Sequence, residues 1–132
     1  MRNLKKTLSI ILVVCVIVAC MAVPAFAREE ATQSINFPNL TAGSSKSATQ
    51  TVYIRPTDTF VVESLSWSPM GNDVRVEFVP VGGGAILGWT YQGGSISYAY
   101  LSMSPLTAGD YTVRVRNVSQ STVTGNLNYS WQ

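Results

Sequence analysis

The stretch Tyr111-Thr112-Val113-Arg114-Val115-Arg116-Asn117 decides the fold class, because large apolar and polar side chains alternate along its whole length. The end of the chain, Val123-Thr124-Gly125-Asn126-Leu127-Asn128-Tyr129-Ser130-Trp131, repeats the same alternation. A period of two is typical of β-strands that turn one face to the core and the other to water. Both stretches are therefore predicted to be strands, and we expect truncation of the last one to be costly.

Similar short runs extend toward the N-terminus, separated by clusters of Gly, Pro, Ser and Asn, and no stretch after Ala27 has a helical period. The expected strands span 49–55, 60–67, 73–81, 85–92, 95–102, 111–117 and 122–131, with at most one more near 34–37. Seven or eight strands at this spacing predict an all-β fold, an antiparallel β-sandwich or jelly roll. We expect this domain to span 49–132, after a polar segment at 28–48.

The pair Gly93-Gly94 predicts a two-residue hairpin turn. In that register Trp89 would pair with Tyr98, and one face of the hairpin would carry Leu87, Trp89, Tyr91, Ile96, Tyr98 and Tyr100. The alternative is an exposed row of rings that stacks on sugars. Because the opposite face of the hairpin is polar and cannot supply a core, we expect the aromatic side chains to lie inside the sandwich.

Residues 1–27 have the pattern of a cleavable signal peptide, with a basic start, a long uncharged stretch and the small-x-small triplet Ala25-Phe26-Ala27. The uncharged stretch is also long enough to remain as a membrane anchor. A third interpretation concerns Cys20, because Ile17-Val18-Ala19-Cys20 resembles the lipobox of bacterial lipoproteins. We expect cleavage after Ala27 and a secreted, extracellular protein that acts in solution or at the cell surface.

Removal of this leader changes the chemistry of the chain. Residues 28–132 contain no cysteine, and the whole chain contains no histidine. Their net charge is −1, whereas that of the full chain is +2, so nucleic acid is not an expected partner. Catalysis of the Ser-His-acid or Cys-His type and the usual zinc sites are excluded. We therefore expect no enzyme, no membrane contact after cleavage, and a monomer.

Trp67 is the aromatic residue with the clearest candidate role, because it ends an expected strand and enters the turn-rich loop 68–72. Binding residues are common on loops that a rigid scaffold holds. The alternative is that the ring folds over the end of the sandwich as a lid. We predict that any glycan or peptide binds at this loop, with Trp67, Met70 and Asn72 as its contacts.

Three aspartates, Asp58, Asp73 and Asp110, are the remaining candidates for chemistry. A pair of carboxylates could serve a glycosidase, and carboxylate oxygens could hold calcium. Each aspartate, however, lies at an expected loop position, where Asp commonly caps its own backbone. Calcium is therefore the only cofactor that the sequence suggests, and no other is expected.

The segment Leu106-Thr107-Ala108-Gly109-Asp110-Tyr111 and the valine-rich strand that follows it resemble a signature of bacterial pre-peptidase C-terminal domains. Ser64-Leu65-Ser66-Trp67 and Asp73-Val74-Arg75-Val76 are similar to earlier strands of that family. The resemblance covers residues 50–131. It implies a non-catalytic jelly roll of the kind appended to secreted hydrolases, which in some members binds calcium or polysaccharide.

The sequence thus predicts a secreted, non-enzymatic module that binds an extracellular or cell-surface polymer, either glycan or protein. The alternative is a structural subunit of a surface layer or fibre that assembles by strand addition. Segment 29–47 is long enough to reach the sheet edge of a neighbour, but it is poor in the alternating apolar residues that a donor strand needs.

Overall fold

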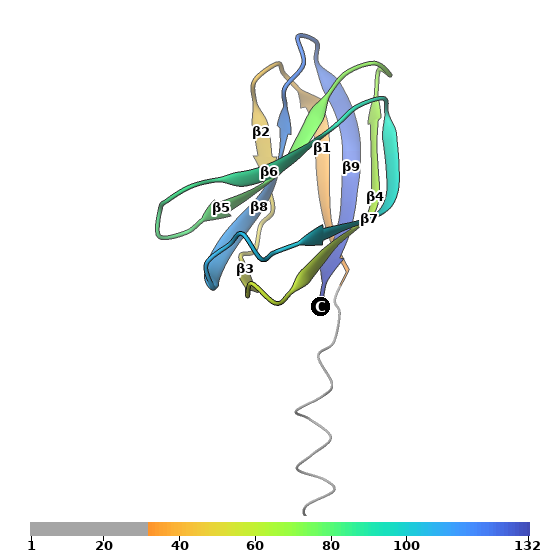
Figure 1. Ribbon diagram of the computed structural model, residues 1–132. Helices are drawn as coiled ribbons and strands as arrows, with labels where there is room; N and C mark the ends of the chain where they lie inside the picture. The colour runs from red at the N-terminus through yellow and green to blue at the C-terminus, as the bar shows by residue number, and fades with distance from the viewer. Residues whose placement is uncertain (1–31) are drawn as a thin grey trace, which may run out of the picture.

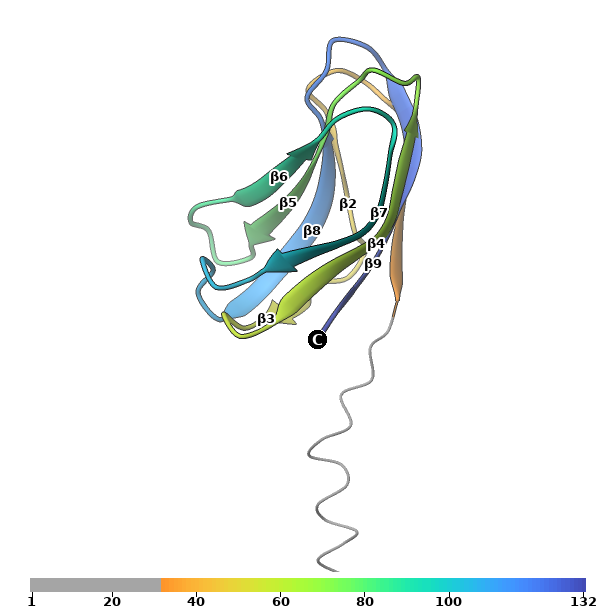
Figure 2. The same cartoon turned by 45° about the vertical axis from the view of Figure 1, so that its right-hand side comes forward.

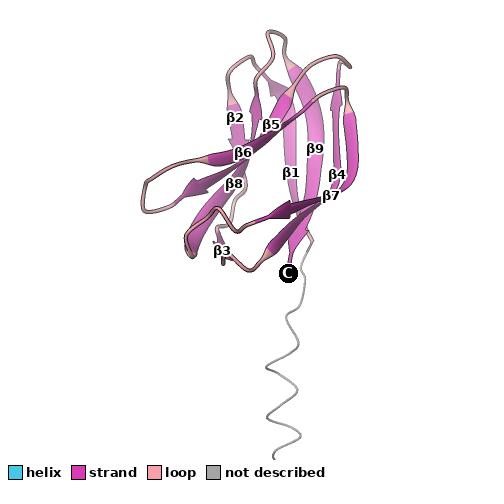
Figure 3. Ribbon diagram, in the orientation of Figure 1, coloured by secondary structure: helices cyan, strands magenta, loops and turns pink. Residues whose placement is uncertain are grey.

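The computed structural model describes residues 32–132, which form nine strands in two antiparallel sheets and contain no helix (Figures 1 and 3). The strands are β1 (Gln33–Leu40), β2 (Ser45–Ser47), β3 (Val52–Ile54), β4 (Thr59–Ser68), β5 (Val74–Pro80), β6 (Leu87–Tyr91), β7 (Ser95–Ser102), β8 (Gly109–Asn117) and β9 (Val123–Trp131). The predicted β-sandwich is confirmed, with slightly more strands than expected. The signal peptide, its cleavage site and Cys20 lie outside the described residues. Nothing in 32–132 is a helix of the length and hydrophobicity needed to cross a membrane.

The two sheets pack face to face (Figure 2). The four-stranded sheet has the order β1-β9-β4-β7, and the five-stranded sheet has the order β2-β8-β5-β6, with β3 also paired to β8. The core between them is formed by the inward side chains of both sheets. The ring centroid of Phe60 lies 4.7 Å from that of Phe78 in the other sheet and 5.0 Å from that of Tyr129. Burial raises the pKa of Tyr129 to about 12.

The alternation predicted for the last two long strands is confirmed. In β8 the buried apolar side chains are Tyr111, Val113 and Val115, and in β9 they are Val123, Leu127 and Tyr129. Their neighbours in sequence point outward, so each strand has one core face and one wet face.

The N-terminal part of the sandwich begins earlier than residue 49, the start expected from the sequence. β1 pairs with β9, and β2 pairs with β8, so residues 33–47 supply strands to both sheets of their own chain. Ile35, Phe37 and Leu40 of β1 are buried in the core. The expectation of a polar segment outside the domain is therefore wrong for this part of the chain.

The hairpin expected at Gly93-Gly94 is not present. β6 pairs with β5 in the five-stranded sheet, whereas β7 pairs with β4 in the four-stranded sheet. The two glycines therefore carry the chain from one sheet to the other. Their carbonyl groups accept hydrogen bonds from the backbone of the loop after β4, with Trp67 N–H on Gly94 at 2.9 Å and Gly71 N–H on Gly93 at 2.8 Å.

An irregularity in the four-stranded sheet reverses the orientation of two tyrosines. Val62 pairs with Tyr129 of β9 but Ser64 pairs with Asn128, so Glu63 is an extra residue in β4. Such a β-bulge shifts the alternation of side chains along the strands around it.

The matching position in β7 is Tyr98, whose φ of 51° is rare for a bulky side chain. Before it, Ile96 packs against the core, and after it Ala99 and Leu101 do so. Tyr98 and Tyr100 consequently point outward and are 68% and 66% exposed. The prediction that these two rings are core residues is wrong. The prediction holds for four others, which pack against the core while partly buried: Leu87, Trp89, Tyr91 and Ile96.

Candidate functional site

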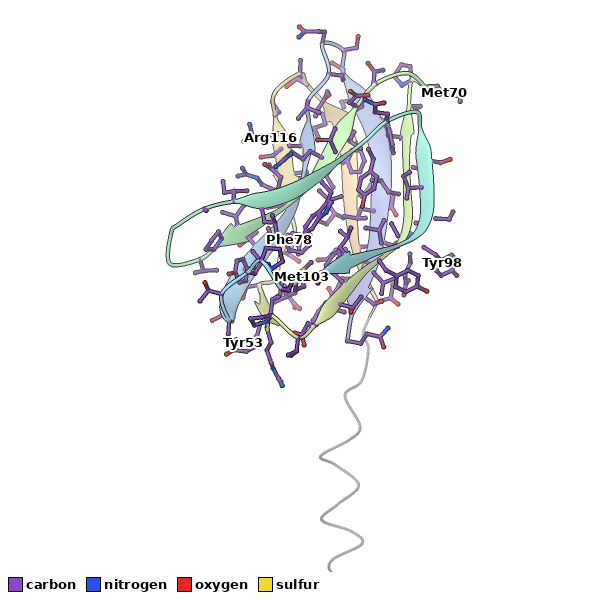
Figure 4. The ribbon with its side chains drawn as sticks, in the orientation of Figure 1. Tyr53, Met70, Phe78, Tyr98, Met103 and Arg116 are labelled. Atoms are coloured by element: carbon purple, nitrogen blue, oxygen red, sulfur yellow. The ribbon has the colours of Figure 1, made fainter. Side chains whose placement is uncertain are left out.

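The loop after β4 does not present an exposed tryptophan. Trp67 is only 4% exposed, and its indole N–H donates a 2.7 Å hydrogen bond to the carbonyl of Asn72. The side chain of Asn72 in turn donates to the carbonyl of Pro69 at 3.0 Å. The ring therefore closes the end of the sandwich as a lid, and the prediction of an exposed stacking residue is wrong. Met70 is 83% exposed at the tip (Figure 4), and ligand binding by Met70 and Asn72 stays a prediction.

The three aspartates do not assemble into a metal site. Asp58 is buried and accepts the backbone N–H of Arg55 at 2.9 Å, which is ordinary turn chemistry. Asp73 precedes β5 and accepts the N–H of Val118 on its carbonyl, at the opposite end of β8 from Asp110. In the described part of the chain, no three His, Cys, Asp or Glu side chains gather in a way that could hold a metal ion. Calcium binding stays a prediction without an assembled site.

The outer face of the four-stranded sheet carries an ordered set of uncharged polar groups. Its strands bring together two rows in register, Ser34–Asn128–Ser64–Ser97 and Asn36–Asn126–Ser66–Ser95. The side chain of Asn128 links the first row, because its oxygen accepts the hydroxyl of Ser34 and its amide N–H donates to Ser64 Oγ at 2.8 Å. These contacts hold the side chains in fixed orientations while leaving other lone pairs and hydrogens toward solvent.

Next to these rows lie the two outward tyrosines and the bulged Glu63. Glu63 Oε1 accepts the hydroxyl of Ser130 at 3.0 Å, and Tyr100 lies opposite Val61 in register. Figure 4 shows the ring of Tyr98 pointing away from the sandwich. We call this surface the tyrosine face, defined by Ser34, Glu63, Ser64, Tyr98, Tyr100, Asn128 and Ser130.

The bulge is the part of this face that gives the clearest sign of function. A non-glycine residue in the left-handed region costs of order 1–3 kcal/mol and is commonly retained at functional sites. Here the irregularity keeps Tyr98 and Tyr100 out of the core, although regular alternation from Ile96 onward would bury them. Two exposed rings beside fixed hydrogen-bonding groups are an arrangement suited to a ligand with both apolar and polar surface.

The outer face of the five-stranded sheet is charged instead. Glu77 of β5 is 6% exposed and accepts N–H groups from Arg114 at 2.9 Å and Arg116 at 3.0 Å, with Arg75 Nε at 3.4 Å from its other oxygen. Burial by itself raises the pKa of Glu77, but the hydrogen bonds and charges of Arg114 and Arg116 outweigh it, so the pKa is lowered. We call Arg75, Glu77, Arg114 and Arg116 the arginine face.

A surface hollow of about 500 Å³ lies between the glycine loop after β5 and the loop before β8. Its walls include Gly82–Gly84, Ile86 and Tyr111, whose hydroxyl donates to the carbonyl of Thr107 at 2.6 Å. Asp110 is the one ionisable side chain on its walls apart from that tyrosine. Because polar groups do not converge there, the hollow is a weaker candidate than either sheet face.

The comparisons with known proteins assign no function to these surfaces. No protein-family model matches the chain, and a comparison with curated proteins likewise gave no match. The resemblance to pre-peptidase C-terminal domains stays an expectation. The function is therefore argued from the two faces themselves.

Proposed function

We propose that residues 32–132 form a non-catalytic module that binds a carbohydrate polymer across the tyrosine face. The observation that carries this proposal is the outward orientation of Tyr98 and Tyr100 beside fixed Asn, Ser and Glu side chains. Tyrosine is enriched at interaction surfaces, because its ring is apolar and its hydroxyl can form hydrogen bonds.

A neutral sugar has apolar C–H surfaces and a rim of hydroxyl groups, and the tyrosine face offers a partner for each. The tyrosine rings supply rigid contact area with little loss of conformational entropy. Asn128 and Ser64 can exchange hydrogen bonds with sugar hydroxyls, since an amide and a hydroxyl each both donate and accept. The carboxylate of Glu63 adds a strong acceptor.

The rest of the chain fits an extracellular role of this kind. The expected leader would direct the module out of the cell, where polysaccharides of walls and matrices are accessible. The resemblance to pre-peptidase C-terminal domains supports the same proposal, because those domains are non-catalytic and some bind polysaccharide.

The test is affinity electrophoresis of the secreted domain through gels that contain neutral polysaccharides of different linkage. Tyr98→Ala and Tyr100→Ala should each weaken retention about tenfold, because central aromatic contacts typically contribute more than ~1 kcal/mol. The matched control is Tyr53→Ala, since Tyr53 is also half exposed but lies on β3 of the other sheet. It should bind as the wild type does.

Two results would contradict the proposal. One is equal weakening by all three tyrosine substitutions, which would point to general surface adhesion. The other is the absence of retention of the wild-type domain by any neutral polysaccharide.

A further inference from the structure

The basic side chains of the described chain are concentrated on one face. Residues 32–132 contain five basic and five acidic side chains, and thus no net charge. Three of the five cations form the arginine face, whereas Lys46, on β2 at the edge of the same sheet, pairs in register with the core residue Val115 and lies on the other side. Figure 4 shows Arg116 and Tyr98 on opposite sides of the sandwich. The arginine face is therefore a separate surface from the tyrosine face.

The strand register places two like charges directly opposite each other. Arg75 of β5 pairs with Arg116 of β8, and the row continues to Thr90 on one side and Ser45 on the other. Like charges in this position destabilise a sheet. Glu77 lies in the next row, opposite Arg114, and its contacts with all three arginines relieve the repulsion. One carboxylate against three guanidinium groups leaves these four residues with a net charge of +2.

The contacts to Glu77 also leave hydrogen-bond donors unused. Arg114 and Arg116 both reach Glu77 through Nε. Among the described residues their Nη groups make no hydrogen bond, and these groups are the paired donors that bind carboxylate, sulfate or phosphate oxygens. The hydroxyls of Ser45 and Ser47 extend the same two rows across β2.

A glycine makes room for the third arginine. Gly88 of β6 pairs with Glu77, and a Cβ at this position would lie 2.5 Å from Nε of Arg75. The side chain of Arg75 therefore lies over Gly88, flat on the sheet and toward β6, and it shares the carboxylate of Glu77 with the two arginines of β8. Its Nη1 is 3.4 Å from the hydroxyl of Thr90.

We propose that the arginine face binds an anionic polysaccharide, a polymer that carries carboxylate, sulfate or phosphate groups along its chain. The Nη groups of Arg114 and Arg116, with Arg75, hold the anionic groups of the polymer. The hydroxyls of Ser45 and Ser47 contact its sugar rings. Glu77 contacts the Nε atoms of all three arginines from beneath and touches no ligand, so it lowers the net positive charge of the face while leaving the Nη groups of Arg114 and Arg116 to the ligand. The module then has two polymer sites on opposite sides, one for neutral sugar and one for anionic sugar.

The test is affinity electrophoresis in gels that contain heparin, polygalacturonate or neutral dextran, with single-stranded DNA as a separate polyanion. The variant is Arg114→Gln with Arg116→Gln, and its control is Arg55→Gln, an exposed arginine in the turn after β3. The wild type should be retarded by heparin or polygalacturonate, and retardation should weaken with salt because exposed charges are screened. The double variant should bind roughly tenfold more weakly, a loss of about 1.4 kcal/mol, whereas Arg55→Gln should stay within about twofold.

Two further variants separate this site from its alternatives. Glu77→Gln should lower the melting temperature but keep or strengthen anion binding, because it removes the competing carboxylate. Tyr98→Ala should leave anion binding unchanged, so failure of the neutral-sugar proposal and failure of this one are distinguishable. The inference is overturned if the wild type ignores both anionic polysaccharides, if Arg55→Gln weakens binding as much as the double variant, or if DNA binds as tightly as the polysaccharides.

Discussion

Across β9 and β4 the outward side chains are mainly Asn and Ser with two tyrosines beside them, whereas across β8 and β5 they include three arginines and one buried glutamate. Both groups of side chains are carried by a pair of neighbouring antiparallel strands, β4 with β9 and β5 with β8. On the tyrosine face the polar side chains bind one another mainly in neutral pairs, such as Asn128 with Ser64, and Glu63 with Ser130 is the exception. On the arginine face a single buried carboxylate holds three cations.

The difference shows that overall charge is a poor guide to this molecule. The described residues have no net charge, yet one sheet presents an excess of positive charge and the other presents neutral hydrogen-bonding groups. In the proposals above, recognition therefore depends on which strand face a side chain occupies. The following substitutions test that dependence, beginning with the largest expected effect.

Gly125 and Gly88 lie in different sheets, and both leave no room for a methyl group. A Cβ at Gly125 would lie 2.1 Å from the carbonyl oxygen of Ser66 and 2.6 Å from the buried ring of Phe37, neither of which can move freely. Gly125→Ala should therefore destabilise the fold by about 3 kcal/mol or more in urea unfolding. The control is Gly109→Ala, where the added Cβ would meet nothing within 4 Å. Equal stability of the two variants would mean that β9 and β4 are not this close.

Glu77 makes the stability of the arginine face depend on pH. Its pKa is lower in the folded protein than in the unfolded chain, because the hydrogen bonds and charges of Arg114 and Arg116 outweigh the effect of burial. The stabilisation is therefore complete above the ordinary glutamate pKa of about 4.3 and is lost as the pH falls through the lowered value. Thermal melts should show wild type above Glu77→Gln at neutral pH, with the gap closing in acid. A gap that is constant with pH would exclude this linkage.

Gly88→Ala should have the smallest effect on stability. The atoms that obstruct a Cβ there belong to the end of the Arg75 side chain, which can swing into solvent. We expect a loss below about 1 kcal/mol in urea unfolding, within the common range for surface substitutions. Anion binding should nevertheless weaken, because Arg75 leaves its place over the sheet. Unchanged anion binding would remove Arg75 from the proposed site.

Simple alternation predicted much of this fold. It identified the core faces of β8 and β9, and it placed Trp89 and Tyr91 correctly on the inner side of β6. It failed for Tyr98 and Tyr100 because a bulge shifts the pattern by one residue, and no residue type in β7 announces a bulge. Alternation alone therefore could not predict the tyrosine face.

Local patterns were also misleading where tertiary contacts decided the outcome. Gly93-Gly94 has the composition of a hairpin turn, but its backbone is bound to the loop after β4 and joins the two sheets. Trp67 lies next to a loop, yet its indole N–H donates to the carbonyl of Asn72, a partner that only the folded loop supplies. The sequence did place Arg114 and Arg116 on a wet face. It could not show that Arg75 and Glu77 join them, because the pairing of β5 with β8 is a long-range contact.

The most direct test of the account is a pair of NMR titrations of the isotope-labelled domain, one with a neutral and one with an anionic oligosaccharide that the electrophoresis has identified. The account predicts two separate sets of shifted signals. The neutral sugar should shift Tyr98, Tyr100 and the Asn128 side-chain amide, and the anionic sugar should shift the Nε–H signals of the three arginines. If both sugars shift the same set, or if the shifts fall on the loop of Met70 and Asn72, the assignment of one ligand to each face is wrong.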